Sequence, residues 1–423
     1  MNEVIETSKG YQDSKLGVIP QEWRIRTLLE LSIDGCKNGL YKSKDCYGTG
    51  IDMVHMGDVF GKDIIFSGLK EKVAISDKEL ENFGLQEGDL LFARRSLDPE
   101  GVGKTALIGN LSFPMTFESS VIRIRPDQQS LNPYYALQYL KSYKGRGQMM
   151  TFARIVAVSG ITGSDLLKYK IPLPPLPEQK KIAAILSTWD QAIAATQKLI
   201  DELKLRNKGL AQQLLTGKKR LKGFDGEWIE VTLKDIAERV TRKNEELDDT
   251  VVTISAQRGF VLQEDFFTKR VASETLSNYY LIHNGEFAYN KSYSKGYPMG
   301  AFKRLDDFEK AVVTTLYICF SLKENVNSDF MKHFFEGGLM IRPLMKIAQE
   351  GGRAHGLLNI GIHDFFGLKL TVPQLVEQEA INSVLSEADE ELKLHQKKLE
   401  TLKEQKKGLM QKLLTGEIRV KTD

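Results

Sequence analysis

The chain has 423 residues, of which 41% are hydrophobic and 27% are charged, and its formal net charge is +3. This length allows two or three domains, the composition is that of a soluble globular protein, and no run of about 18 apolar residues could form a transmembrane helix. The small net charge means that a polyanionic partner must be held by local basic patches.

The N-terminal segment MNEVIETSKGYQDSKLG is polar and of mixed charge, so we expect no secretory signal. The three cysteines, Cys36, Cys46 and Cys319, lack metal-ligand spacing, and their odd number argues against a disulfide framework. The six histidines are scattered along the chain. We therefore expect a cytoplasmic protein with free thiols, no metal site and no membrane association.

Residues 20–170 are predicted to form a mixed α/β domain, with strands at 88–96 and 119–126 and a helix at 132–142. Within it, DPEGVGKTALIGN (98–110) resembles the end of a nucleotide-binding P-loop. The P-loop pattern requires glycine where Asp98 stands, and a helix where TALIGN is typical of a strand. The segment is therefore predicted to be a strand–loop–strand tip.

Two segments of the chain are copies of each other. Residues 171–221 align without a gap on residues 370–420, and 21 of the 51 aligned residues are identical. Each segment begins with a Glu-Gln pair (178–179 and 377–378) after one or more prolines and ends with Leu-Leu-Thr-Gly. A second similarity opens each half, because IPQEWRIRTLLEL (19–31) resembles FDGEWIEVTLKDI (224–236). The chain is thus an internal duplication with two divergent inserts.

Both copies are predicted to be long helices with a heptad seam, because apolar residues recur at alternating spacings of four and three. Gly217 and Gly416 stand where helix C-caps are expected. A helix over 178–215 would be a rod of roughly 57 Å, and two such helices in one chain can pair antiparallel. The seam is predicted to contain Ile182, Leu186, Trp189, Ile193, Ile200, Leu203, Leu210, Leu214, Ile381, Leu385, Leu392, Leu399, Leu402, Leu409 and Leu413.

Residues 225–370 are predicted to repeat the plan of the first insert with different residues. Strands are expected at 285–294 and 311–322, followed by a helix-like stretch at 327–345. Polar side chains able to contact bases or phosphates follow the first strand of each pair, and a glycine-containing basic loop precedes each proline entry. The candidate DNA-binding residues are Arg94, Arg95, Ser96, Lys104, Lys144, Arg146, Arg154, Asn290, Lys291, Ser292, Tyr293, Lys295, Arg353 and His355.

No catalytic constellation is recognisable in the sequence. The methyltransferase tetrad of Asn or Asp, two prolines and an aromatic residue is missing, as are a glycine-rich methyl-donor fingerprint and the paired acids with lysine of nucleases. We therefore predict no catalytic residues, no metal and no cofactor in this chain.

The repeated LPPLPEQKKIAAIL and VPQLVEQEAINSVL helix starts, the LLTG helix ends and the Glu-Trp openings resemble the specificity subunit of type I restriction–modification systems. The resemblance implies an α+β fold with two target-recognition domains separated by two long antiparallel coiled-coil helices. The domains would be 1–177 and 222–376, and the helices 178–221 and 377–423.

The resemblance also implies a function. Each recognition domain would read one half of a bipartite site in double-stranded DNA. The helices would set the half-site spacing and dock two adenine-methylating modification subunits, which in turn bind the restriction/translocase subunits. The chain itself would be non-catalytic, with S-adenosylmethionine and ATP bound by the partner subunits.

The sequence leaves several alternatives open: a specificity protein of a non-type I methyltransferase system, a solitary DNA-binding protein, a P-loop-like nucleotide-binding protein, and a dimeric or purely structural coiled coil. It does not indicate the recognised bases, the spacer length, the DNA distortion or the oligomeric state, because base readout depends on side-chain geometry.

Overall fold

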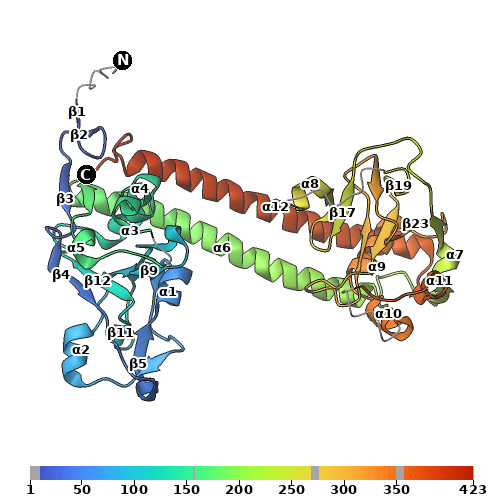
Figure 1. Cartoon of the computed structure of the whole chain (residues 1–423), viewed down its shortest axis with the longest axis horizontal. Coiled ribbons are helices and arrows are strands. Elements are labelled where there is room, and N and C mark those ends of the chain that lie inside the picture. The colour runs from blue at the N-terminus through green and yellow to red at the C-terminus, as the bar shows by residue number, and fades with distance from the viewer. Residues whose placement is uncertain (1–9, 156–157, 268–275, 349–356, 423) are drawn as a thin grey trace. The chain divides into compact units, whose positions relative to one another are not determined.

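The computed structural model describes residues 10–155, 158–267, 276–348 and 357–422. It divides into two compact units, the first formed by Met1–Gln197 with Lys397–Asp423 and the second by Lys198–Gln396. Two long helices, α6 (Leu176–Leu214) and α12 (Leu375–Leu413), pass from one unit to the other (Figure 1). No helix among the described residues is long and apolar enough to cross a membrane.

Unit 1 is built on two sheets, three two-stranded pairs and the helices that pack on them. The larger sheet has the order β4 (Ser32–Asn38), β12 (Val121–Pro126), β8 (Leu90–Ala93), β10 (Thr105–Ile108) and β6 (Ile64–Ile65). The second sheet has the order β11 (Met115–Phe117), β5 (Tyr47–Val54) and β7 (Lys72–Val73). Strand β3 (Arg24–Thr27) pairs antiparallel with β14 (Lys170–Leu173), which leads into α6.

Unit 2 repeats the central order of the larger sheet in unit 1. Its main sheet runs β16 (Ala237–Val240), β23 (Ile318–Leu322), β20 (Phe287–Asn290) and β21 (Ala301–Arg304). Two further antiparallel pairs are a hairpin of β17 (Val252–Ser255) and β18 (Gly259–Leu262), and β19 (Tyr280–His283) with β22 (Lys310–Val313), which are separated in the chain by β20 and β21. Strand β15 (Ile229–Thr232) pairs with β24 (Lys369–Val372) before α12, as β3 pairs with β14 before α6.

The predicted strand at 311–322 is wrong in one respect, because the structure has two strands there, β22 and β23, joined through a turn at Thr314–Tyr317. The predicted helical stretch 327–345 is likewise two helices, α9 (Ser328–Glu336) and α10 (Ile341–Ile347). Gly337 and Gly338 separate these helices, and Gly338 has a φ of 76°, which favours glycine and ends the first helix.

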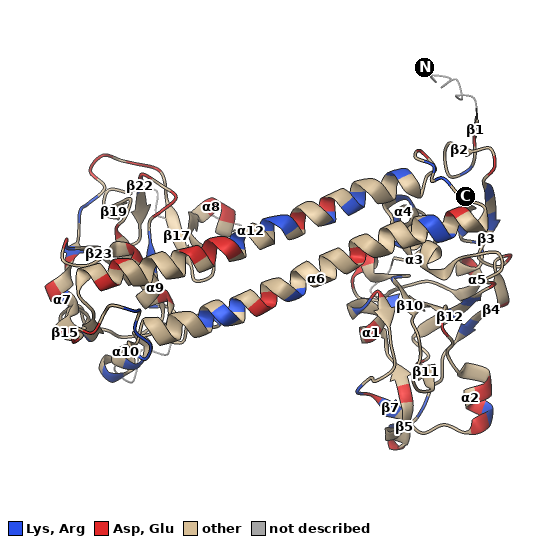
Figure 2. Cartoon of the chain, turned by 180° about the vertical axis from the view of Figure 1, so that it is seen from behind, with Lys and Arg blue, Asp and Glu red and all other residues tan. Residues whose placement is uncertain are grey.

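Within each unit the two long helices lie side by side and antiparallel. In unit 1, Ile182 and Leu186 share a core cluster with Leu413 and Leu414. In unit 2, Leu214 and Leu215 share one with Ile381 and Leu385. All fifteen predicted seam residues are buried or half-buried. Figure 2 shows basic and acidic residues interspersed along both helices, although 178–221 carries nine basic and four acidic groups.

Polar seam residues fix how the helices meet. In unit 1, Lys406 Nζ lies 2.6 Å from Asp190 Oδ1, and the other oxygen of Asp190 accepts hydrogen bonds from Tyr134 and Gln138. In unit 2, Asn207, which occupies the position equivalent to Lys406, donates its side-chain amide to the backbone oxygen of Ala388 at 2.7 Å. These buried pairings satisfy polar atoms in only one register, so they specify the alignment of the helices.

The repeated Glu-Gln pair connects each helix start to two other parts of its unit. Gln179 accepts a hydrogen bond from the backbone N–H of Asn132, the N-cap of α3 (Pro133–Lys141). Glu178 accepts two hydrogen bonds from Arg419, at 2.7 and 2.9 Å, and one from the indole of Trp23 at 3.1 Å. Glu178 and Gln179 therefore bind the start of α6 to the N-cap of α3, to Trp23 and to the segment that follows α12.

The same connections recur in unit 2. Gln378 accepts a hydrogen bond from the backbone N–H of Asn327, the N-cap of α9. Glu377 accepts two hydrogen bonds from Arg220, at 2.6 and 2.7 Å. Each glutamate is almost fully buried, so its charge requires the arginine partner.

We expect Arg419→Met to destabilise the protein by about 2 kcal/mol, because it leaves the buried Glu178 carboxylate without its cation. This loss of stability is smaller than the loss expected for a fully buried ion pair, because the Arg419 side chain is 36% exposed. Urea unfolding measures the loss. The control is Arg26→Met, which removes an exposed pair with Glu30 and should change stability by less than about 0.5 kcal/mol. Equal effects of the two substitutions would show that Glu178 does not depend on Arg419.

Candidate nucleic-acid interface

Four of the predicted residues of unit 1, Arg94, Arg95, Ser96 and Arg154, lie on or next to a short two-stranded ribbon. Strand β9 (Arg95–Ser96) pairs antiparallel with β13 (Ser159–Gly160), and Arg154 forms a further backbone bridge to Gly160. Arg95 is exposed, and the Arg154 side chain is 73% exposed and 3.5 Å from Asp165. Arg94 is half-buried, and its backbone is hydrogen-bonded on both sides, to Ser120 and Ile161.

Large apolar side chains are exposed beside these arginines. Leu97, directly after β9, is 83% exposed, and Ile155 and Val158 on the facing loop are also exposed. Isolated exposed apolar residues are common on protein surfaces, but several of them around a ribbon that also carries the exposed Arg95 and Arg154 suit a nucleic-acid surface. Guanidinium groups bind phosphates or guanine edges, and apolar groups contact thymine methyls.

Lys104 and Arg146 are held by the protein itself. The Lys104 ammonium donates to the backbone oxygen of Phe60 and lies over its ring at 5.9 Å. Arg146 donates to the backbone oxygens of Glu100 and Val102 at 2.6 and 3.0 Å, and burial lowers the pKa of its guanidinium. Both cations therefore brace the loop 98–104, beside a cleft of about 660 Å³ that they help to line.

The P-loop resemblance has no structural counterpart. Asp98 caps a single 3₁₀ turn (Pro99–Gly101), Gly103 has a φ of 64°, and Thr105 begins strand β10 rather than a helix. Ser96 is buried, and its hydroxyl accepts a hydrogen bond from the backbone N–H of Asp98. The glycines serve the turn between β9 and β10, and the lysine amino group is directed at a carbonyl.

Lys144 lies apart from this ribbon in the chain, on helix α4 (Tyr143–Phe152). Lys144 and its neighbour Tyr143 are both exposed. The Lys144 ammonium group approaches Gly17, so a Cβ added there would lie 3.4 Å from Nζ. This exposed lysine is available to a phosphate.

In unit 2 the predicted residues follow β20, as those of unit 1 follow β8. The Asn290 side chain accepts a hydrogen bond from the backbone N–H of Ser292 at 3.0 Å, which closes a turn. The backbone oxygen of Lys291 accepts from Leu358, and Ser292 bridges to Leu357. Tyr293 and Lys295 are exposed at the tip. Arg353 and His355 lie outside the described residues.

Sequence reasoning missed the residues that hold each domain to its helix, although a signal was present. Arg220 and Arg419 are identical in the gapless alignment of the two copies, as are Asp190 and Asp389. His333, on α9, approaches Asp389 at 3.8 Å, and burial lowers the pKa of this histidine.

Among the described residues, no group of three or more histidine, cysteine or acidic residues could hold a metal.

Comparisons with known proteins agree with this architecture. Residues 20–205 match the family model described as the type I restriction modification DNA specificity domain. The MjaX type I restriction enzyme specificity subunit of Methanocaldococcus jannaschii is 25% identical over 98% of this chain and 98% of its own length. The EcoKI specificity subunit of Escherichia coli is 29% identical over 45% of this chain and 40% of its own length.

Solved structures show the same fold at low sequence identity. The S subunit of a type I restriction–modification system from M. genitalium superposes with a TM-score of 0.53 at 17% identity, covering 92% of this chain and 96% of that one. A chain from a structure on type I system assembly has a TM-score of 0.55 at 16% identity, covering 95% and 99%. With its duplicated helices, repeated sheet order and a relative that matches almost its whole length, the chain is similar to type I restriction–modification specificity subunits.

Proposed function

We propose that this chain recognises a bipartite DNA sequence for a type I restriction–modification complex, with one half-site read by each unit. Sequence-specific DNA recognition is supported by the match of residues 20–205 to a DNA specificity domain and by the similarity to specificity subunits. The observation that supports recognition of two half-sites is that the two units share a sheet order but differ in the loops that follow the central strands. The β8–β10 loop of unit 1 and the β20–β21 loop of unit 2 follow equivalent central strands, yet present different side chains.

The residues that we assign to base or phosphate contact are exposed on these loops or on the segment facing them. In unit 1 they are Arg95 on the β8–β10 loop and Arg154 before β13, with the half-buried Arg94 beside Arg95, and in unit 2 they are Tyr293 and Lys295. Tyrosine provides a ring that stacks on sugars or bases together with a hydroxyl, while lysine supplies a phosphate contact. Ser96, Lys104 and Arg146 are assigned to shaping the loop in unit 1, because their polar atoms contact the protein.

The remaining parts of the complex belong to the same proposal. Two modification subunits would dock against the long helices and bring S-adenosylmethionine, and the ATP-dependent restriction subunits would bind through them. The domain division at 1–177, 178–221, 222–376 and 377–423 describes the same arrangement. This division is supported by the starts of α6 at Leu176 and α12 at Leu375, each of which lies just after a proline at the end of its insert.

The proposal is tested by sequencing the methylated bases of a host that expresses this chain with its modification subunit. The expected result is one methylated motif with two defined halves separated by unspecified bases. Expression of the modification subunit alone is the control and should give no such motif. Methylation at a continuous motif, or without sequence preference, would contradict the two-reader assignment.

Arg95→Ala should relax recognition in one half-site only. Loss of an arginine–base contact costs about 1–3 kcal/mol, so methylation of the cognate site should fall roughly 10-fold to 100-fold relative to sites altered in that half. The same methylation sequencing measures the change. Arg24→Ala, an exposed arginine on β3, is the matched control and should leave the motif unchanged. An equal loss of preference in both halves would contradict the assignment.

A further inference from the structure

We propose that a cavity at the Gly217 end of α6 binds a short extended segment of the modification subunit. This inference rests on the proposed function. The segment would sit as residues 11–20 of this chain sit on the equivalent surface of unit 1. Unit 1 thus carries its own peptide at this position, whereas unit 2 presents the surface to a partner.

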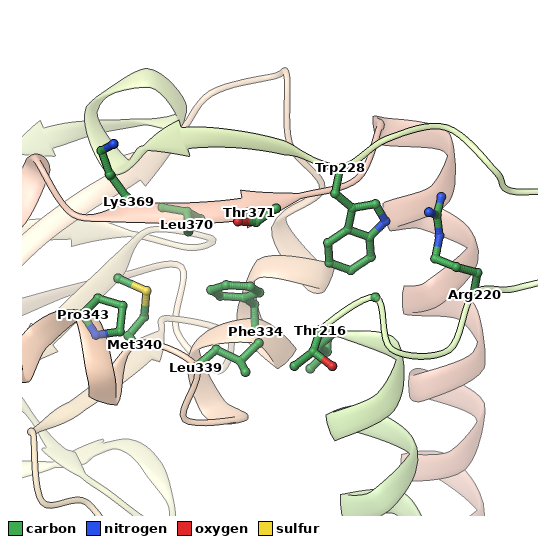
Figure 3. Close-up of a pocket in the computed structure, with 12 residues that line it drawn as sticks. Thr216, Arg220, Trp228, Phe334, Leu339, Met340, Pro343, Lys369, Leu370 and Thr371 are labelled. Atoms are coloured by element: carbon green, nitrogen blue, oxygen red, sulfur yellow. The ribbon is translucent and has the colours of Figure 1, made fainter.

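The cavity has a volume of about 550 Å³ and lies entirely within unit 2. Figure 3 shows Phe334, Leu339 and Met340 on one side and Trp228 on another, with Thr371 of β24 between them. Phe334 and Met340 are buried, while Leu339 is half-buried. The lining is thus apolar at its base and ringed by polar groups, which suits a peptide with aliphatic side chains.

The surface at the equivalent place in unit 1 is covered by the chain's own N-terminal arm, residues 11–20. Ile19 is buried in the core cluster of unit 1, and Leu16 packs against the same cluster. The Tyr11 hydroxyl donates to the backbone oxygen of Gly416 at 3.0 Å. Pro20 lies so close to Gly416 that a Cβ there would be 2.4 Å from the proline ring.

The correspondence between the two surfaces is residue by residue. Gly217 and Gly416 are aligned in the two helix copies and have φ angles of 67° and 75°. Trp228 lies beside Gly217, at 3.4 Å from a Cβ added there, as Trp23 lies beside Gly416 at 3.3 Å. Leu339 follows the N-cap of α9 by the same number of residues as Lys144 follows the N-cap of α3, so the two residues are equivalent in sequence position. Lys144 is the residue that approaches Gly17 of the arm.

Unit 2 cannot cover this surface in the same way, because of its connectivity. The residues before Trp228 are the tail of α6 itself, and Arg220 in that tail is bonded to Glu377 and lies over the Trp228 ring at 5.8 Å. The Trp228 indole N–H is buried and has no hydrogen-bond acceptor among the described residues, whereas Trp23 donates to Glu178.

The charges around the cavity distinguish it from its counterpart. After Gly217 the chain continues with Lys218, Lys219 and, three residues later, Lys222, all exposed. The aligned positions after Gly416 hold Glu417, Ile418 and Lys421. The expected occupant is therefore an extended segment with two aliphatic residues three positions apart, a following proline and acidic flanks. A second copy of this chain does not fit this position, because its arm is engaged in its own unit 1.

The first test uses the full chain and a labelled peptide of the arm sequence, YQDSKLGVIP, with binding followed by fluorescence anisotropy. We expect saturable binding at one site, weakened at least tenfold by Leu339→Asp. Met345→Asp is the control, since Met345 is exposed on helix α10, which follows Leu339 in the chain, and does not line the cavity. A peptide carrying aspartate in place of its leucine and isoleucine should not bind. Absence of binding, or binding insensitive to Leu339→Asp, would overturn the assignment.

The second test identifies the natural occupant. A photo-crosslinking amino acid placed at position 339 in the assembled complex, without DNA, should attach to the modification subunit, and mass spectrometry should locate one segment of the expected chemistry. Crosslinks to a second copy of this chain, or only within the chain, would overturn the proposal. Neither test measures methylation. Failure of the proposed docking site and failure of the bipartite DNA assignment can therefore be told apart.

Discussion

Leu203→Asp should destabilise the protein by about 3–5 kcal/mol and abolish its assembly with the modification subunit. Leu203 is 5% exposed on α6, and its replacement both removes buried apolar contacts and places a carboxylate among them. Urea unfolding gives the loss of stability, and co-elution with the modification subunit in gel filtration reports assembly.

The matched control for this substitution is Leu205→Asp, two residues along the same helix. Leu205 is 73% exposed, so the same chemical change should shift stability by less than about 0.5 kcal/mol. If the two variants unfolded at the same urea concentration and assembled equally, the pairing of α6 with α12 through Leu203 would be refuted.

Insertion of seven residues into both long helices should change the spacing within the DNA site and leave both half-sites unchanged. The insertions belong after Gln197 and after Gln396, which are aligned in the two copies and mark the boundary between the units. One heptad lengthens a helix by about 10 Å and preserves the seam. This is roughly three base pairs of DNA at 3.4 Å each, so the unspecified spacer should lengthen by about three.

Methylation sequencing of the host reports the spacer directly. An insertion in α6 alone is the control, because it shifts one helix against the other and breaks the buried pairings on one side of the insertion, such as Lys406 with Asp190. That variant should fail to assemble. If the double insertion gave the parental spacer, the helices would not set the distance between half-sites.

The helical frame was predictable because its signals are repeated and periodic. The expected helix at 178–215 is α6, Leu176–Leu214, and it begins slightly earlier because proline is tolerated in a first turn, where Pro177 lies. The glycines after each helix do take the left-handed conformation that the C-cap prediction requires. The duplication also made the antiparallel pairing of the helices predictable.

The inserts were less predictable, since short strands and turns depend on their neighbours. The stretch 311–322 has enough apolar residues for one strand, yet the turn near Thr314 sends its two parts to different sheets. The direction of a side chain is still harder to infer. Lys104 and Arg146 look like anion-binding residues in the sequence, but their donors meet backbone carbonyls that only the folded loop brings near.

The division of the chain between its units has a consequence for synthesis on the ribosome. Unit 2 is continuous, whereas unit 1 needs residues 397–423, where Leu413, Leu414 and Arg419 complete the surroundings of Trp23 and Glu178. The domain translated first is therefore completed last, and it must wait with exposed core residues while the second is made. A premature stop codon near the end of the gene would thus leave unit 1 incomplete. Unit 2, whose sequence lies closer to the stop codon, would keep all of its residues.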